Sequence, residues 1–220
     1  MLLLALDTST PAVTAGLVAL DETSGAVDVL AERVTINPRA HGELLTPHLK
    51  DAASTAGVAL SDLDAVVCGI GPGPFTGLRA GMVTAASLAH ALDIPAYPVC
   101  SLDAIAAEAG TGTPLLVATD ARRREVYWAR YAADGTREAG PAVSPPADID
   151  IGGARVVGQA GAMLTDTANE PSYPTTNGLA RAAASSVMAR GEPEPLTPLY
   201  LRRPDAAEPG ERKRVTEVSR

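Results

Sequence analysis

The residues with the clearest chemical meaning form a glycine-rich stretch near the end of the first third of the chain. It reads Gly71-Pro72-Gly73-Pro74-Phe75-Thr76-Gly77-Leu78-Arg79. Glycines between a strand and a helix let backbone N–H groups face an anion at the helix N-terminus, where Thr76 would act as a cap or a phosphate ligand. A tight turn without a ligand explains the same residues, and the motif alone favours that simpler interpretation.

Two aspartates end similar apolar runs and suggest phosphoryl chemistry. Asp7 ends Leu-Leu-Leu-Ala-Leu-Asp, and Asp120 ends Leu-Leu-Val-Ala-Thr-Asp. Carboxylates at strand ends can position Mg²⁺ or a phosphate-bound water, although aspartate is also a good turn residue. Neither is followed by a glycine that would let the backbone close on a phosphate. The candidate nucleotide or phosphate contacts are Asp7, Ser9, Thr76 and Asp120.

Histidine, serine and cysteine do not combine into a metal site or a nucleophile. His41 and His48 are separated by about 10 Å along a helix, whereas two ligands of one metal each lie about 2 Å from it. No segment resembles a nucleophile elbow. Cys68 and Cys100 lie in or at the end of apolar runs without CxxC spacing, so we expect buried, reduced thiols.

The run after the glycine-rich stretch predicts a helix over about 77–92 with small residues in a row. Gly77, Gly81, Ala85 and Ala89 recur at every fourth position. Such a row lets another helix backbone approach closely. Packing on the chain's own sheet would cover one face, but this helix is apolar on nearly all sides, which predicts a partner helix. The flanking apolar residues are Leu78, Met82, Ala86 and Leu92.

Apolar periodicity predicts an α/β protein. In the first hundred residues we expect strands over 2–6, 14–20, 27–35, 65–70 and 96–100, with helices over 41–56 and about 77–92. Pro47 would kink the first helix or, with Thr46 as N-cap, begin its main part. The strand, helix and strand over 65–100 predict a parallel crossover.

The second hundred residues repeat part of this order. Ser101 should cap a helix that ends at Gly110, and strands should cover 115–119, 125–131, a segment near Ala142, and 155–157. Asn177 should cap a helix over 178–190. Because strand, aspartate, turn and strand occur twice, the sequence suggests a duplicated half-domain.

Composition limits the class of protein. Of 220 residues, 46% are apolar and only 3% are aromatic, which predicts a core of Ala, Val, Leu and Ile. The net charge of −8 disfavours direct binding of RNA, with the run Arg122-Arg123-Arg124 and the segment 202–220 as basic exceptions. The N-terminus lacks a basic leader and no apolar run reaches membrane-spanning length, so we expect a cytoplasmic protein without membrane contact.

Five motifs, spread in order over nearly the whole chain, carry a family resemblance. They are Leu-Ala-Leu-Asp-Thr-Ser-Thr over 4–10, His41-Gly-Glu-Leu-Leu-Thr-Pro, the stretch from Gly71 to Arg79, Asp120-Ala-Arg with Glu125-Val-Tyr, and Pro198-Leu-Tyr-Leu-Arg. Together they resemble the bacterial TsaB/YeaZ family of tRNA threonylcarbamoyladenosine biosynthesis proteins. The glycine-rich stretch is the most specific, and Pro74 departs from the family's preference for Ser.

The resemblance implies an actin-like, Hsp70-like (ASKHA) fold of two RNase-H-like halves, here residues 1–100 and 101–203. The polar and charged composition beyond Arg203 predicts a flexible tail over 204–220. It implies a non-catalytic accessory subunit that binds and activates TsaD, a related subunit. TsaD transfers the threonylcarbamoyl group to the adenosine beside the anticodon of tRNA, and it binds metal through paired histidines that this chain lacks.

The resemblance also implies the partners and their surface. The two helices of the first half would pack on their counterparts in TsaD, TsaE would join as an ATPase, and tRNA would be bound through the complex. The chain would hold no cofactor of its own, with ATP or ADP at the complex interface, and a homodimer could form in isolation. The alternative is an active ATPase or kinase of the same fold that uses Asp7 and Asp120. The interface candidates are His41, Leu45, Leu49, Gly77, Leu78, Gly81, Met82, Ala85 and Ala89.

Overall fold

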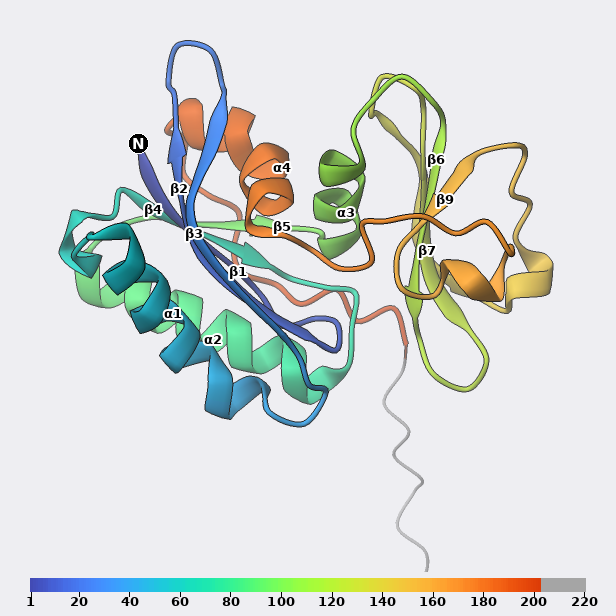
Figure 1. Ribbon diagram of the computed structural model, residues 1–220, viewed down its shortest axis with the longest axis horizontal. Coiled ribbons are helices and arrows are strands. Elements are labelled where there is room, and N and C mark those ends of the chain that lie inside the picture. Colours follow the sequence, from blue (N-terminus) through green and yellow to red (C-terminus); the bar gives the residue numbers. More distant parts are fainter. Residues whose placement is uncertain (203–220) are drawn as a thin grey trace, which may run out of the picture.

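Two lobes, each built on one β-sheet, make up the computed structural model of the protein (Figure 1). The structure describes residues 1–202, and the predicted tail over 204–220 lies outside the described residues. Within this described part, no helix is long and apolar enough to cross a membrane.

The first lobe contains a five-stranded sheet in the order β3-β2-β1-β4-β5. β1 pairs antiparallel with β2 and parallel with β4, so the strand before the glycine-rich stretch lies beside the strand that ends at Asp7. β1 and β4 consist mostly of Leu, Ala and Val because helices cover both of their faces. The strands are β1 (Leu2–Asp7), β2 (Ala12–Leu20), β3 (Val27–Ile36), β4 (Ala65–Gly69) and β5 (Ala96–Val99).

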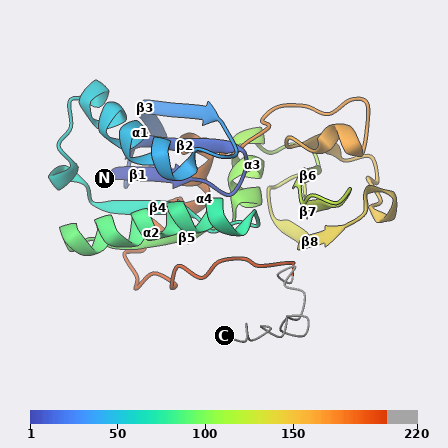
Figure 2. The same cartoon turned by 90° about the horizontal axis from the view of Figure 1, so that it is seen from below.

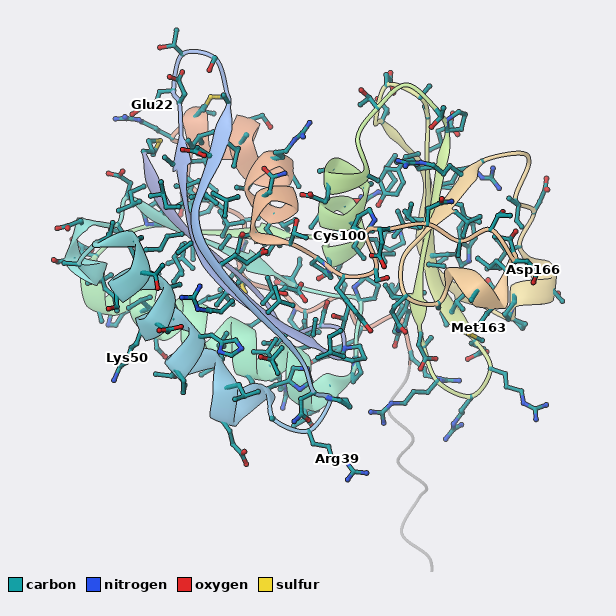
Figure 3. All side chains as sticks on the ribbon, viewed as in Figure 1. Glu22, Arg39, Lys50, Cys100, Met163 and Asp166 are labelled. Atoms are coloured by element: carbon teal, nitrogen blue, oxygen red, sulfur yellow. The ribbon has the colours of Figure 1, made fainter. Side chains whose placement is uncertain are left out.

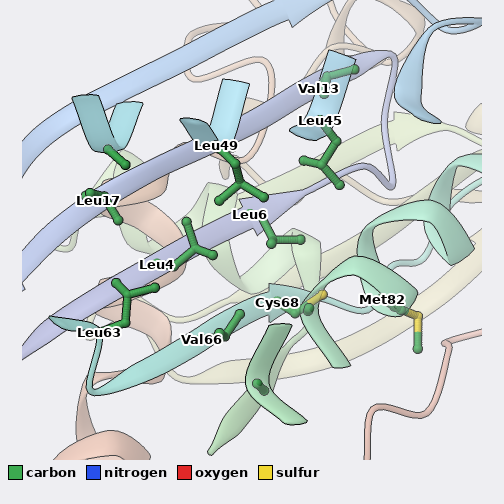
Figure 4. Close-up of a cluster of buried hydrophobic side chains, with 14 of the residues drawn as sticks. Leu4, Leu6, Val13, Leu17, Leu45, Leu49, Leu63, Val66, Cys68 and Met82 are labelled. Carbon is green, nitrogen blue, oxygen red and sulfur yellow. The ribbon is translucent and has the colours of Figure 1, made fainter. Parts of the chain in front are cut away.

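Helices α1 (His41–Ala56) and α2 (Phe75–Leu92) lie on one face of this sheet, and α4 (Thr176–Met188) lies on the other (Figure 1). Side chains alternate along a strand. Leu4 and Leu6 of β1 therefore pack beneath α1 and α2, whereas Leu3 packs beneath α4. Figure 4 shows the first of these cores, which consists of aliphatic side chains together with Cys68 and Met82.

The second lobe contains a four-stranded sheet in the order β8-β7-β6-β9. Helix α3 (Ser101–Ala109) packs on one face, where Leu102 and Ile105 meet Leu115 and Tyr131. Loops and short 3₁₀ turns around Ile149 cover the other face. The strands are β6 (Leu115–Asp120), β7 (Val126–Tyr131), β8 (Arg137–Ser144) and β9 (Arg155–Val157).

The two sheets share one strand plan. In each, three consecutive strands form an antiparallel meander, and a later strand pairs parallel with the first, as β4 does with β1 and β9 with β6. Asp7 and Asp120 end the two equivalent strands. This repeat is the duplicated half-domain that the sequence predicts.

Helix α4 lies within the predicted second half, residues 101–203, but packs on the sheet of the first lobe. Its residues Leu179, Ala183 and Val187 complete the core of the first lobe. The chain then returns as an extended segment past α2 toward the second lobe (Figure 1, Figure 2); we call residues 196–202 the C-terminal strap. The first lobe therefore draws on both ends of the described chain, because the second face of its sheet also needs an apolar helix.

The residues predicted to cap the helices do not do so in the structure. α1 begins at His41 and runs through Pro47 without Thr46 acting as its N-cap. Ser101 is the first residue of α3, and its hydroxyl is bonded to Asp7 instead of capping the helix. The N-cap of α4 is Thr175, while the Asn177 side chain donates to Glu108. In α3 and α4, tertiary partners take the polar groups that local sequence assigns to capping.

Candidate functional site

A cavity of about 770 Å³ opens between the two lobes. The tips of the β1–β2 and β6–β7 hairpins, the start of α2 and the C-terminal strap line it. Three predicted phosphate contacts, Ser9, Thr76 and Asp120, lie on its wall. We call this cavity the interlobe cleft.

The fourth candidate, Asp7, does not line the interlobe cleft. Its Oδ1 accepts hydrogen bonds from the N–H and the hydroxyl of Ser9, each at 2.8 Å, and its Oδ2 accepts one from the hydroxyl of Ser101 at 2.5 Å. Burial raises the pKa of Asp7, although these hydrogen bonds act in the opposite direction. Both of its oxygens are therefore occupied, one by Ser9 of the same hairpin and the other by Ser101 at the start of α3.

The equivalent Asp120 is exposed in the cleft, where it accepts a hydrogen bond from the N–H of Arg122 at 2.7 Å. The three arginines that follow have φ values of 62°, 53° and 62°, in the left-handed region that residues other than glycine seldom adopt. All three are exposed. The β6–β7 hairpin therefore presents consecutive arginines, Arg122 to Arg124, at the edge of the cleft.

Hydrogen-bond donors gather on the cleft wall. The hydroxyl of Thr119 is buried and has no hydrogen-bond partner in the described structure. Helix α2 begins on the same wall, with Pro74 at its N-cap and no acidic residue in its first turn. The first N–H groups of a helix have no intrahelical acceptor and favour an anion. With Arg122 and Arg202 beside them, these donors can hold an oxyanion.

The predicted partner-interface residues are buried in the isolated chain, where its own elements cover them. On α2 the row of small residues faces the chain's own sheet and the β1–β2 hairpin. His41 is bonded through Nε2 to the carbonyl of Thr10 at 2.7 Å. The buried set is His41, Leu45, Leu49, Gly77, Leu78, Gly81, Met82, Ala85 and Ala89.

The row of small residues is explained by one close approach. Thr8 donates its hydroxyl to the carbonyl of Gly77 at 2.7 Å and accepts the N–H of Gly81 at 3.0 Å. A Cβ at Gly81 would lie 2.4 Å from that hydroxyl oxygen, far inside contact distance. The glycines thus let α2 pack against the hairpin of its own lobe.

The outer face of α2 nevertheless carries apolar side chains. Val83 is 64% exposed and Phe75 is 47% exposed. The Arg79 guanidinium lies 3.7 Å from the centroid of the Phe75 ring, and the Tyr200 ring stacks on Phe75 with centroids 5.3 Å apart. The outer face of α2 therefore combines these two apolar side chains with polar ones, Thr76, Arg79, Ser87 and His90.

The C-terminal strap links the two lobes along the cleft. The N–H of Leu199 donates to the carbonyl of Ile70 at 2.9 Å, and Arg79 donates through Nε to the Tyr200 hydroxyl at 3.0 Å. In the second lobe, Arg202 donates to the carbonyl of Ala121 at 2.7 Å and pairs with Glu125. The strap therefore holds the β6–β7 hairpin near the start of α2.

Metal-ligating side chains do not cluster among residues 1–202. His48 is bonded through Nε2 to the Thr35 hydroxyl at 2.9 Å. Both cysteines are free, and burial raises the pKa of Cys68 and raises that of Cys100 to about 12. The two thiols are therefore protonated, as expected for inert cysteines.

Several residues of the cleft escaped the sequence analysis. Thr119 is hidden inside an apolar strand, and Gln159 belongs to no motif. Tyr127 belongs to the motif Asp120-Ala-Arg with Glu125-Val-Tyr. The strap residues Tyr200 and Arg202 belong to the motif Pro198-Leu-Tyr-Leu-Arg, which contributes to the family resemblance. That motif was the available signal for them.

A family model described as TsaD: tRNA N6-adenosine threonylcarbamoyltransferase matches residues 29–189, most of the chain. The protein therefore belongs to the class of two-lobed α/β proteins that this family defines. An uncharacterized protein of Mycobacterium tuberculosis is 54% identical over 206 residues, which cover 92% of each chain. The Escherichia coli protein TsaB is 37% identical over 137 residues, which cover 61% of this chain and 56% of TsaB.

Solved structures show which members of this family the chain resembles. The structure of YeaZ from Pseudomonas aeruginosa superposes with a TM-score of 0.73 at 32% identity, covering 91% of this chain and 99% of YeaZ. A second Pseudomonas aeruginosa structure, of an uncharacterized protein similar to peptidase YeaZ, gives a TM-score of 0.69 at 31% identity. The chain is thus a TsaB/YeaZ-like member of the family, and the predicted ASKHA fold of two RNase-H-like halves is confirmed.

Proposed function

We propose that this protein is a non-catalytic, cytoplasmic accessory subunit that binds TsaD and activates it for threonylcarbamoyl transfer to the adenosine beside the anticodon of tRNA. The observation that carries most weight is the internal bonding of Asp7. A phosphoryl-transfer site needs carboxylate oxygens that face a metal or a water in the cleft, whereas both oxygens of Asp7 are bonded to Ser9 and Ser101. Membership of the TsaB/YeaZ-like proteins supports the proposal.

The surface proposed for TsaD is the outer face of α2, together with the neighbouring exposed side of α1. Val83 and Phe75 supply the apolar contacts of that face, and exposed apolar side chains gathered on one element mark interaction sites. A second copy of this chain would use the same face when TsaD is absent. TsaE joins this complex as the ATPase, and ATP or ADP binds at the complex interface while this chain holds no cofactor of its own.

Size-exclusion chromatography with light scattering, on this chain mixed with the TsaD of the same organism, tests the proposal. The wild-type chain should form a stable complex, at the expense of any homodimer. Val83→Glu should weaken that complex at least tenfold by placing a charge in the contact, and Val34→Glu on β3, an exposed valine away from α2, should leave it intact. A wild-type chain that forms no complex, or equal behaviour of the two variants, would overturn the proposal.

The exposed Asp120 is the observation that favours the alternative, an ATPase or kinase, because it lies in the cleft with Ser9 and Thr76. ATP turnover by the purified chain decides between the two. We expect the rate of ATP hydrolysis to equal that of a blank without protein, with Asp120→Ala unchanged from wild type. Turnover that disappears in Asp120→Ala would establish the enzyme in place of the accessory subunit.

A further inference from the structure

The cationic side chains at the mouth of the interlobe cleft stand out from the rest of the molecule. The whole chain has a net charge of −8, yet Arg39, Arg122, Arg123 and Arg124 are all exposed at this mouth. Pro38, next to Arg39, lines one side of the cleft, and Arg122 and Arg123 line the other. Figure 3 labels Arg39 at the lower edge of the first lobe. We call these four residues the arginine rim.

The wall of the cleft adds hydrogen-bond donors that also favour an anion. The buried Thr119 hydroxyl has no partner in the described residues, and leaving a buried hydroxyl without a hydrogen-bond partner is unfavourable. The start of α2 faces the same space without an acidic residue in its first turn. Asp120 is the only acidic residue among the lining residues that the structure describes, and it is bonded to the N–H of Arg122. An oxyanion would satisfy these donors.

The extent of the rim identifies the kind of anion. Arg122 and Arg123 line the cleft, whereas Arg39 and Arg124 are exposed beside it and are not lining residues. A small anion inside the cleft would leave these outer guanidinium groups without a ligand. A chain of phosphodiesters would contact both sets, because arginine pairs well with phosphate and successive phosphates extend along the backbone.

The backbone of the hairpin supports this interpretation. Three consecutive residues other than glycine adopt left-handed φ values at Arg122 to Arg124, which is costly and persists where the surroundings or a function require it. The result is a turn in which three consecutive arginines are all exposed, whereas side chains on a strand alternate between its two faces.

We propose that the arginine rim and the interlobe cleft bind backbone phosphates of the RNA on which the TsaD complex acts. This inference rests on the proposed function, since it takes tRNA as the substrate of that complex. It assigns to this subunit a direct, sequence-independent contact with the substrate, made chiefly by arginines that lie outside α2.

The test measures the affinity of the assembled complex for an unmodified tRNA transcript over a series of salt concentrations. The variant Arg122→Glu/Arg124→Glu should weaken binding at least tenfold. It should also reduce the slope of log affinity against log salt by about 1.4–1.8, the value for two lost phosphate contacts. The control Arg181→Glu/Arg190→Glu makes the same charge change at exposed positions on and just after α4, and should retain wild-type slope and affinity to within about threefold.

Equal effects of the rim and control variants would overturn the proposal, since only total charge would then matter. Titration with ADP and with inorganic phosphate tests whether the cleft binds a small phosphate-containing ligand instead of RNA. Binding of ADP that the rim variant abolishes, with tRNA affinity unchanged, would assign the cleft to a small ligand and overturn the RNA contact. Arg122→Gln/Arg124→Gln should give an intermediate loss, and thermal unfolding of each variant shows that the fold is intact.

Formation of the complex is verified first by size exclusion. This step distinguishes a failure of the proposed function from a failure of the proposed RNA contact. If the wild-type chain forms no complex with TsaD, the proposed function fails, and the same tRNA titration is run on this chain alone. Loss of RNA binding in the rim variant but not in the control would then still support the rim, and equal binding by both would overturn it.

Discussion

The β1–β2 and β6–β7 hairpins occupy equivalent positions in the two lobes but differ in what surrounds them. In the first, Asp7 is 1% exposed and bonded to Ser9 and Ser101, and α2 packs closely on Thr8. In the second, Asp120 is exposed, and the strap holds the hairpin through Arg202. The same residue type at the same topological position serves folding in one lobe and faces a cleft in the other. Burial, and not the motif, decides the role.

The largest effect should come from loosening the first hairpin. A Cβ at Gly73 would lie 2.0 Å from the carbonyl oxygen of Ser9, which is backbone and cannot move aside. Gly73→Ala should therefore lower the free energy of unfolding by about 3 kcal/mol, measured by urea denaturation. Gly42→Ala on α1, with no atom within 4 Å of the new Cβ, is the control and should be neutral or stabilising. Equal midpoints for the two variants would mean that the first hairpin is not tightly packed.

The next largest effect should separate the two aspartates. Asp7→Ala removes three hydrogen bonds and leaves the hydroxyls of Ser9 and Ser101 without their acceptor, so unfolding should become easier by about 2 kcal/mol. Asp120→Ala should leave the urea midpoint within experimental error, because its side chain is exposed. Similar losses for both variants would remove the contrast between the hairpins.

The sequence predicts that both hairpins share one order of strands, but it does not predict which of the two aspartates is buried. Alternation and turn residues suffice to place the repeated strand, aspartate and strand, and apolar periodicity predicts α1 over its observed range. The spacing of Gly77, Gly81 and Ala85 predicts a close-packing surface, yet this spacing alone does not show whether the neighbour is the chain's own hairpin or a partner. The orientation of Asp7 depends on Ser101, which is far away in the chain, and no local pattern reports such a contact.

Acidity should affect the two hairpins differently. Burial raises the pKa of Asp7 above its ordinary value of 3.8, so the folded protein holds a proton at pH values where the unfolded chain has released it. Folding then takes up a proton, and the contribution of Asp7 to the free energy of unfolding falls as pH rises through this window.

Urea denaturation of wild type and Asp7→Asn over a pH series measures this contribution. The difference in unfolding free energy, wild type minus variant, should decrease as pH rises above 3.8 and be constant at lower pH. A difference that increases with pH would show that the hydrogen bonds to the carboxylate outweigh its burial.

The smallest effect should come from the strap. Arg202→Ala removes the hydrogen bond to the carbonyl of Ala121 and the pair with Glu125, both partly exposed, so the loss of stability should be about 1 kcal/mol or less. Hydrogen exchange at the β6–β7 hairpin should increase nonetheless, while exchange at the β1–β2 hairpin stays as in wild type. Faster exchange in both hairpins would show that the strap stabilises the whole molecule and not the second hairpin.

The position of α4 also determines the order in which the protein can be completed during synthesis. The sheet face formed by Leu3, Val18 and Val67 is covered by α4, whose residues 176–188 are made after the entire second sheet. A chain emerging from the ribosome can close the second lobe while the first still exposes an apolar surface. The first lobe is thus the first to be synthesised and the last to be completed. In the order of the chain, the second lobe is an insertion within the first.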